Sequence, residues 1–526
     1  MDIGQQLMEF LSFSNPAGLV ALPILGCFIL FFIPGHRANL VRWISTIFAF
    51  AVLIISFYFF LSFDHSEGGR QFIYEYEWLS LIGPWGESQR AISMSVGIDG
   101  IAVTMVLLTG IVMFTGTVVS WNINVNNKDF FILYFLLLSG VFGVFIAYDL
   151  FFFFFFYELS VLPMYLLIGK WGSSSKFSSF ERTKEYSAMK LTLVLVAGSV
   201  LVWVAIIAMF VQSGTGSFHI DEIQKVIPDK FSSEFQSAFF LMLMIGFGIL
   251  AGLWPFHTWS PDGHVAAPTA VSMVHAGVLM KLGAFGIIRV GMTLLPEGAQ
   301  IWMPLLIGLG AVNVIYGALS AMGQTDLKYV IGYSSVSHMG YVLMGLGTLS
   351  LVGLNGAVLQ MFSHGVMTAL FFAVVGMIYE RTHTRDSLVL SGLAQKMGII
   401  AIFFTLAGLT SLGLPGLSGF AAELLIFIGI FQSYEIWGII LGSLAVIGAA
   451  ITAVYILRLL SKVFFGLPDD TLPEYLDSTR REKFAASILV IFIVLVGLWP
   501  FPFVKVIESG VEPILLQIVG AGRTST

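Results

Sequence analysis

Apolar residues run through this chain in long windows, with little of the alternation that marks half-buried strands or surface helices. The windows are about 20 residues long, which is the length a helix needs to cross the hydrocarbon core of a bilayer. We therefore predict an all-α polytopic membrane protein with about 14 transmembrane helices. The predicted spans are 18–33, 41–62, 98–120, 130–148, 150–169, 187–211, 236–258, 265–290, 300–322, 329–350, 353–379, 398–431, 436–463 and 484–504.

Two predicted spans, the seventh and the twelfth, contain a proline among apolar residues, at Pro255 and Pro415. Proline removes a backbone hydrogen bond and clashes with the preceding turn, so both helices should break there. A break at membrane depth is tolerated inside protein or against a cavity, and paired breaks in two halves of a chain point to an ion path. Because these spans are five apart, we predict two inverted five-helix repeats. Ordinary kinks in a passive bundle are the alternative.

This spacing divides the chain into four parts. Residues 1–129 hold the first three helices and an outer loop, and residues 130–290 hold helices 4–8, the first repeat. Residues 300–463 hold helices 9–13, the second, inverted repeat. Residues 464–526 hold helix 14 and a tail.

The composition agrees with a membrane protein and excludes most soluble classes. Hydrophobic residues make up 57% of the chain and charged residues 11%, whereas about 25% is usual for charged residues in soluble proteins. We see neither a basic stripe nor an aromatic platform for nucleic acid. Cys27 is the only cysteine, so the chain cannot ligate an iron–sulfur cluster by itself. The N-terminus lacks the features of a cleavable signal peptide, so we expect the first helix to stay.

Lys and Arg are distributed unequally between the two sets of loops. With 14 spans, sixteen of them fall on one face and seven on the other, while Lys190 and Lys281 are assigned to the membrane. Loops rich in Lys and Arg stay in the cytoplasm. We therefore predict that both termini lie on the non-cytoplasmic side.

Glu158 follows six consecutive phenylalanines in the middle of an apolar span. An ionised side chain at the bilayer centre costs at least about 2.5–3.5 kcal/mol, so such residues usually face a bundle interior and serve an ion or proton path. No Lys or Arg lies within a helical turn of Glu158, and we predict that Lys190 of the next span is its partner. A static structural ion pair is the alternative reading of the same two residues.

Lys281, His338 and His364 lie in similarly apolar surroundings on the eighth, tenth and eleventh spans. A lysine in hydrocarbon can change its charge, and a histidine changes its charge near neutral pH. Together they favour a horizontal polar chain in which a proton moves through Lys281, His338 and His364, in that order, to Glu423. Snorkelling to an interface is the alternative for Lys281, and a quiet structural role is the alternative for each histidine. His275 precedes Lys281 by six residues, about 240° around a helix, and should face different neighbours.

Glu423 lies eight residues after Pro415, where a terminal proton acceptor with access to one side of the membrane would sit. His257, Asp262 and His264, at the junction after the seventh span, could suggest a metal. Their spacing matches no common ligand pattern, so we favour capping and loop hydrogen bonds.

Four segments together resemble a known family. They are GIDGIAVTMVLLTG from residue 97, WPFHTWSPDGHVAAPTAVSMVHAGVLMKLGAFGIIR from 254, QTDLKYVIGYSSVSHMGYVLMG from 324 and IYERTHTRD from 378. The stretch from about 95 to 460 is similar to the antiporter-like membrane subunits of respiratory complex I, of the NuoM (chain 4) type.

The resemblance implies 14 helices, inverted repeats, broken helices seven and twelve, and a central polar axis. It maps the family's proton-pathway residues onto Glu158, Lys190, Lys281, His338, His364 and Glu423. One position departs from the family, because Leu250 stands where a helix-seven lysine usually partners the glutamate of helix five. Lys190 and His275 would then have to take over that role, or the subunit conducts differently or not at all.

The expected function is therefore that of a proton-translocating membrane subunit of a complex I-like NAD(P)H or ferredoxin:quinone oxidoreductase, in an energy-transducing membrane such as a bacterial inner membrane. We expect no cofactor in this chain; the electron donor, flavin, iron–sulfur clusters and quinone would belong to partner subunits. The expected partners are other membrane and peripheral subunits, neighbouring antiporter-like subunits and lipid. A large subunit of a cation/proton antiporter and a non-pumping membrane scaffold are the rival readings.

Overall fold

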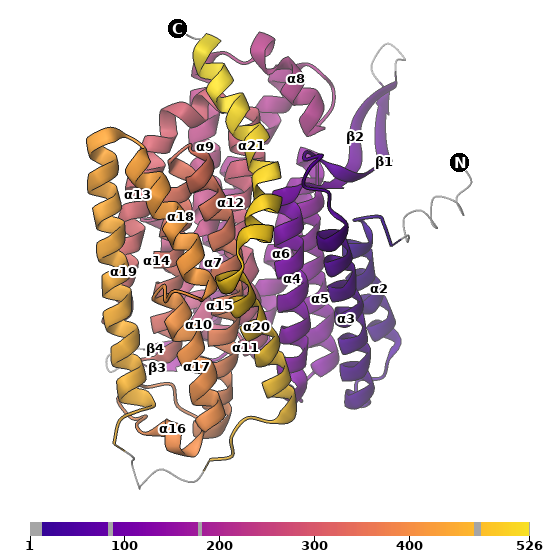
Figure 1. The fold of residues 1–526 in the computed structure, drawn as a ribbon. Helices are drawn as coiled ribbons and strands as arrows, with labels where there is room; N and C mark the ends of the chain where they lie inside the picture. Colours follow the sequence, from indigo (N-terminus) through magenta and orange to yellow (C-terminus); the bar gives the residue numbers. More distant parts are fainter. Residues whose placement is uncertain (1–12, 83–87, 177–180, 468–474, 525–526) are drawn as a thin grey trace.

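The computed structural model describes residues 13–82, 88–176, 181–467 and 475–524 of the chain. The molecule is a bundle of helices that run up and down between two ends (Figure 1). One end carries α16 (Leu393–Lys396) and the strand pair β3 (Ser175–Lys176) and β4 (Glu181–Arg182). The opposite end carries α8 (Ile220–Lys230) and the C-terminus.

Ten helical segments are long and apolar enough to cross a membrane, and a bent pair of helices raises this to eleven in the described part of the chain. The integral-membrane, helical fold is thereby confirmed, whereas the number 14 stays a prediction. The long helices are α3 (Ala38–Ser62), α4 (Gly100–Val119), α5 (Asn127–Ile146), α6 (Leu150–Trp171), α7 (Lys184–Ser213), α9 (Ser233–Ala251), α13 (Pro296–Met322), α14 (Leu327–Gly347), α15 (Leu351–Thr382), α19 (Glu435–Val463) and α20 (Arg480–Leu498). Shorter helices are α2 (Gly18–Phe32), α10 (Trp259–Ala266), α11 (Thr269–Val274), α12 (Met280–Gly286), α17 (Gly398–Ser411) and α18 (Ser418–Gln432).

Polar residues in the turns start many of these helices. Asp99, Asp149, Thr183, Asp326 and Ser350 each accept a hydrogen bond from a backbone N–H in the first turn of the helix that follows. Such caps satisfy donors that have no partner within the helix. The apolar windows therefore have defined beginnings, and the helices alternate in direction.

Burial separates the central helices from the peripheral ones. The apolar windows of α4, α15 and the segment Thr269–Met292 are 100% buried, while those of α3 and α7 are 39% buried and that of α19 is 33% buried. The three fully buried segments lie in the interior of the bundle. The outer ones present apolar side chains to the surroundings, as helices in contact with lipid do.

Both predicted breaks occur. The helix α9 ends at Ala251, and a short 3-10 turn, η2 (Phe256–Thr258), leads into α10. Asn313 of α13 bonds to the freed backbone there, with Oδ1 2.6 Å from Trp254 N and Nδ2 2.8 Å from Gly252 O. The second break separates α17 from α18. The two broken helices begin at opposite ends of the bundle, which fits the predicted inverted repeats (Figure 1).

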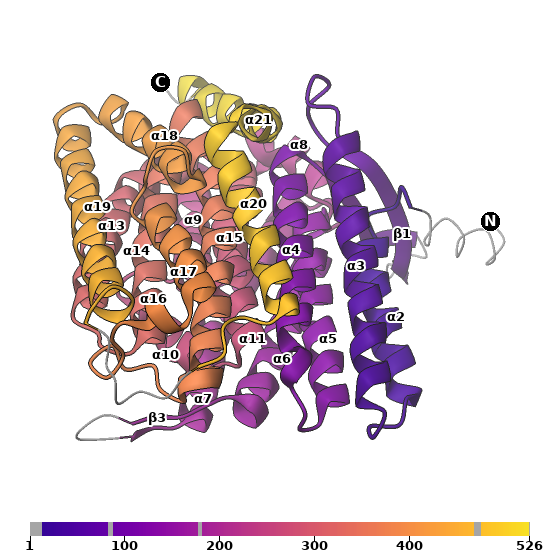
Figure 2. The same cartoon turned by 60° about the horizontal axis from the view of Figure 1, so that its bottom comes forward.

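Three features were not expected from the sequence. Within the outer loop, β1 (Gln71–Ile82) and β2 (Ser88–Ile98) pair as an antiparallel hairpin, so the described chain is not purely helical. The predicted tail is largely the helix α21 (Phe501–Thr524). The helix α20 ends at Leu498, inside the predicted span 484–504, and α21 follows at an angle of 79°. Figure 2 shows α20 running along the bundle and α21 lying across its end.

Candidate functional site

A row of buried polar side chains crosses the interior from α12 to α18. Lys281 of α12 is fully buried, donates to the backbone oxygen of Ala276, and lies with Nζ 2.7 Å from Nδ1 of His364 on α15. The rings of His364 and His338, on α15 and α14, have centroids 5.4 Å apart. Nδ1 of His338 lies 3.4 Å from a carboxylate oxygen of Glu423 on α18.

The horizontal chain that the sequence suggested is thus present as an arrangement of side chains. Its order differs from the expected one. We expected Lys281 to be followed by His338 and then His364, whereas His364 contacts Lys281 and His338 contacts Glu423. The order follows from the packing of the three helices, which sequence position does not fix.

The backbone around Lys281 is wider than an ordinary α-helix. Two π-helical stretches, η3 (His275–Leu279) and η4 (Ile287–Met292), flank α12. Turns of this kind often occur at functional sites. The stretch η3 also lies very close to α15, because a Cβ at Gly365 would come within 2.6 Å of the Gly277 oxygen. Close contact of these two glycines brings Lys281 within reach of His364.

The second break positions Glu423. Gly413 has a φ of +72°, which a glycine adopts without strain, and a Cβ at this position would lie 2.8 Å from a carboxylate oxygen of Glu423. The carboxylate therefore sits against the gap between α17 and α18. Ser411, the last residue of α17, lies 2.9 Å from Nε2 of His338. The break and the histidine are parts of one site.

A second group of polar residues continues the row on the other side of Lys281. The rings of His275 and His264, on η3 and α10, have centroids 4.0 Å apart, and His275 also stacks on Trp259. Both ring nitrogens of His275 are buried and have no hydrogen-bond partner among the described residues. His275 and Lys281 therefore face different neighbours, as the helical spacing predicted.

The expected pairing of Lys190 with Glu158 is wrong in this structure. Nζ of Lys190 lies 2.8 Å from a carboxylate oxygen of Asp262 on α10, and Arg182 bonds to the other oxygen of the same carboxylate. The hydroxyl of Tyr329 also bonds to Asp262, at 3.1 Å. Asp262 is thus a buried carboxylate with two cations, a stronger role than the loop hydrogen bonding we favoured for it.

Glu158, on α6, packs against a part of α7 that is far from Lys190. It contacts Ser199, and one turn away Phe154 stacks on Trp203 with ring centroids 4.6 Å apart, which fixes the register of α6 against α7. Ser199 is nine residues from Lys190, or about 13–14 Å along a helix. The lysine and the glutamate are therefore too far apart along α7 to pair.

Within the described residues Glu158 makes no ion pair, and the residue of α9 near its level is the apolar Leu250. Gly198, next to Ser199, packs against Gly246 and Ile249 of α9, so residue 250 lies near the level of Glu158. Leu250 is fully buried there. Among the described residues, one oxygen of Glu158 is buried without a hydrogen-bond partner.

Several residues of the site carry no signal of their own in the sequence. Gln360 donates toward Nδ1 of His338 at 3.4 Å, and Tyr455 bonds to Ser334 near the same histidine. Lys328, counted among the loop cations, is buried with Nζ 2.7 Å from the oxygen of Ala267. Gln360 lies four residues before His364, on the same face of α15. That spacing is the one signal that could have found it.

Comparison with known proteins shows to which family the chain belongs. Residues 147–451 match the family described as NADH:quinone oxidoreductase/Mrp antiporter, TM. The chain belongs to this family. Chain 4 1 of the NAD(P)H-quinone oxidoreductase of Synechococcus elongatus is similar over 487 residues at 37% identity, covering 92% of this chain and 88% of that relative. The predicted resemblance is confirmed.

Solved structures of the family share the fold. A chain of respiratory complex I from Thermus thermophilus superimposes with a TM-score of 0.83 at 25% identity, covering 95% of this chain and 99% of that chain. A chain of the Mrp complex from Dietzia sp. gives a TM-score of 0.79 at 18% identity, covering 96% and 97%. The second likeness shows the fold alone.

Proposed function

We propose that this chain is a proton-translocating membrane subunit of a quinone oxidoreductase complex, and that the buried row from Lys281 to Glu423 carries the proton. The observation that supports this most directly is the spacing of four titratable groups from four helices. Neighbours are close enough for proton transfer directly or through one water. Keeping Lys281 and Glu423 in an apolar bundle is costly, which a purely structural role would not repay.

The atoms define a direction for each step. Lys281 gives a proton from Nζ to Nδ1 of His364. Nε2 of His364 is buried with no hydrogen-bond partner in the described part of the chain, so it can pass its proton on toward His338. His338 then holds the proton on Nδ1 and gives it to the carboxylate of Glu423. Glu423 releases it to the outer side through the gap between α17 and α18.

The supply side of the path runs through α10. Lys190 and Asp262 form an ion pair at the end of the bundle that carries β3 and β4. Opposite charges at short distance in low dielectric interact strongly, so opening this pair changes the field at His264, His275 and Lys281. Glu158 stands apart, half-buried between exposed Phe155 and Leu162. We propose that it senses charge on the neighbouring subunit.

A cation/proton antiporter is the second candidate. Its sequence support is weaker, because the relatives named as quinone oxidoreductase chain 4 are far more similar than the Mrp chain, which shares the fold alone. Sodium also prefers several clustered oxygen ligands, whereas Lys and His dominate this row. A non-pumping scaffold is the third candidate, and Leu250 is its best support.

The chain is expected to work together with partner subunits in a membrane. We place NADH or another donor, flavin, iron–sulfur clusters and quinone in partner subunits, and antiporter-like subunits beside this one in the membrane. We place the chain in an energy-transducing membrane, such as a bacterial inner membrane, with both termini outside the cytoplasm.

The test removes one end of the row at a time. Lys281→Met and Glu423→Gln, introduced separately into the complete complex, should assemble on a native gel and lose most of both quinone reduction and proton pumping. Lys170→Met is the matched control, because its ion pair with Asp129 is exposed and lies outside the row. It should keep both activities.

Three outcomes separate the candidates. Loss of both activities with normal assembly supports the proposed path. Pumping and turnover at the original ratio in both variants would make the chain a scaffold. Proton movement that requires added sodium would favour the antiporter.

A further inference from the structure

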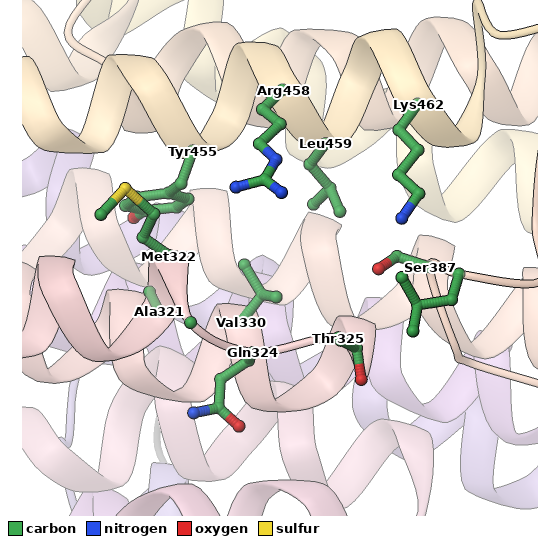
Figure 3. A pocket seen from close by; sticks show the side chains of 12 residues that line it. Ala321, Met322, Gln324, Thr325, Val330, Ser387, Tyr455, Arg458, Leu459 and Lys462 are labelled. Atoms are coloured by element: carbon green, nitrogen blue, oxygen red, sulfur yellow. The ribbon is translucent and has the colours of Figure 1, made fainter.

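A pocket of about 120 Å³ opens between α13, α14 and α19 at the end of the bundle that carries α16. Arg458 and Lys462 of α19 form one wall, and Ser387 faces them from the segment after α15, as Figure 3 shows. Gln324 and Thr325, between α13 and α14, line its floor. The described residues that line the pocket include no carboxylate.

The two cations differ from most basic side chains at this end of the bundle. Arg381 pairs with Glu482 at 2.7 Å, Arg385 with Asp326 at 3.2 Å, and Lys190 with Asp262. Within the described ranges, Arg458 and Lys462 make neither a hydrogen bond nor an ion pair. They stand one helical turn apart, where like charges repel. Two unpaired cations held over one pocket favour an anion.

The pocket lies at the end of a helix that faces outward. The apolar window of α19 is only 33% buried, and Ile447, Val454 and Leu457 are exposed along it toward the pocket. Acyl chains of lipids can pack on this apolar surface. Arg458 and Lys462 lie at the end of the surface, where the head groups of such lipids would lie. A free anion from solution would make no contact with these apolar side chains.

We propose that this pocket binds the phosphate of an anionic phospholipid whose acyl chains lie along α19. Guanidinium and ammonium groups both bind phosphate strongly, and the hydroxyls of Ser387 and Thr325 can donate to it. Basic pockets between transmembrane helices on the cytoplasmic side are known to hold anionic head groups, and this end carries the excess of Lys and Arg. The inference does not depend on the proposed function.

The test measures lipid retention by native mass spectrometry of the full chain in detergent, titrated with phosphatidylglycerol. The double variant Arg458→Gln/Lys462→Gln should bind phosphatidylglycerol roughly thirtyfold more weakly, if each cation near the surface contributes as usual. The matched control is Arg480→Gln/Lys483→Gln, which removes the same charge from the same end outside the pocket. It should bind like the original chain.

Further arms identify the ligand and guard against misfolding. Phosphatidylcholine should bind poorly to every form, and millimolar inorganic phosphate should not displace phosphatidylglycerol. The charge-preserving variant Arg458→Lys/Lys462→Arg should restore binding, and each single Gln variant should show part of the loss. Equal binding by the pocket and control variants would overturn the proposal. Displacement by inorganic phosphate would show a phosphate site rather than a lipid site.

Discussion

At the scale of single residues, Nδ1 of His338 has one donor and one acceptor within the same distance. Nε2 of Gln360 and a carboxylate oxygen of Glu423 each lie 3.4 Å from this nitrogen. Without a proton Nδ1 accepts from Gln360, and with a proton it donates to Glu423. The nitrogen thus has a polar partner nearby whether or not it carries a proton, which suits a proton relay.

Gln360→Leu removes the partner of the unprotonated state. We expect proton pumping to fall by about 2–10-fold, which corresponds to the usual net value of one hydrogen bond, while the complex assembles normally. Gln212→Leu, at the end of α7, is the control and should pump normally. An unchanged pumping rate in Gln360→Leu would show that Gln360 does not position His338.

Asp149 gives a second residue-scale prediction, outside the spans. It lies in the turn between α5 and α6, and burial raises the pKa of its carboxyl to about 7. The unfolded carboxyl loses its proton near the usual value of 3.8, whereas the folded one keeps it until about pH 7. The free energy of unfolding should therefore fall as pH rises between these values and then level off.

Asp149→Asn keeps an N-cap acceptor and removes the titration. The purified full chain with this change should melt at a higher temperature than the original near pH 8 and at the same temperature near pH 4. The measurement is thermal unfolding followed by circular dichroism. If the melting temperatures of the two proteins differed by the same amount at both pH values, the pH dependence would not come from Asp149.

At the scale of elements, contact between η3 and α15 sets the geometry of the row. Cβ atoms at Gly277 and Gly365 would approach the opposite backbone oxygen to 3.1 and 2.6 Å. The second distance is shorter than real Cβ contacts allow. The helices can approach this closely because both positions lack a side chain, as small residues permit in membrane helices.

Gly365→Ala should therefore separate η3 from α15 and lengthen the contact between Lys281 and His364. We expect the rate of proton pumping to fall by a larger factor than the amount of assembled complex. Gly277→Ala should lose less of the pumping rate than Gly365→Ala. Gly308→Ala on α13, where a Cβ meets nothing within 4 Å, is the control and should behave normally. Equal behaviour of all three variants would mean that the close contact is unimportant.

At the scale of the whole molecule, the basic loops gather at one end of the bundle. β3, β4 and α16 lie at that end, and the β1–β2 hairpin, α8 and the C-terminus lie at the other (Figure 1). The basic residues of β4 and α16, Arg182 and Lys396, thus belong to the same end of the bundle. The positive-inside rule then predicts that this end of the bundle faces the cytoplasm.

Labelling of single cysteines tests this orientation. In a Cys27→Ser background, Leu467→Cys at the basic end should react with an impermeant maleimide in inverted membrane vesicles and not in spheroplasts. Glu67→Cys, beside the β1–β2 hairpin, should show the reverse. The opposite pattern would place both termini in the cytoplasm.

Much of the architecture could be predicted from the sequence, because the signals are local. The length of an apolar window decides whether a helix crosses the membrane, and Pro255 and Pro415 decide where two helices break. The charges of Lys281 and Glu423 were costly enough in their own windows to mark them as parts of a site. The end of α20 at Leu498 was missed, since apolar residues continue past the bend.

Partners within the site were decided by tertiary structure alone. Whether Lys190 meets Glu158 or Asp262 depends on the level at which α6, α7 and α10 pack, and no single helix contains that information. The order of His364 and His338 likewise follows from three helices that are separate in sequence. Hydrophobicity along a chain is a local property, whereas the pairing of charges depends on helices that meet only in the folded bundle.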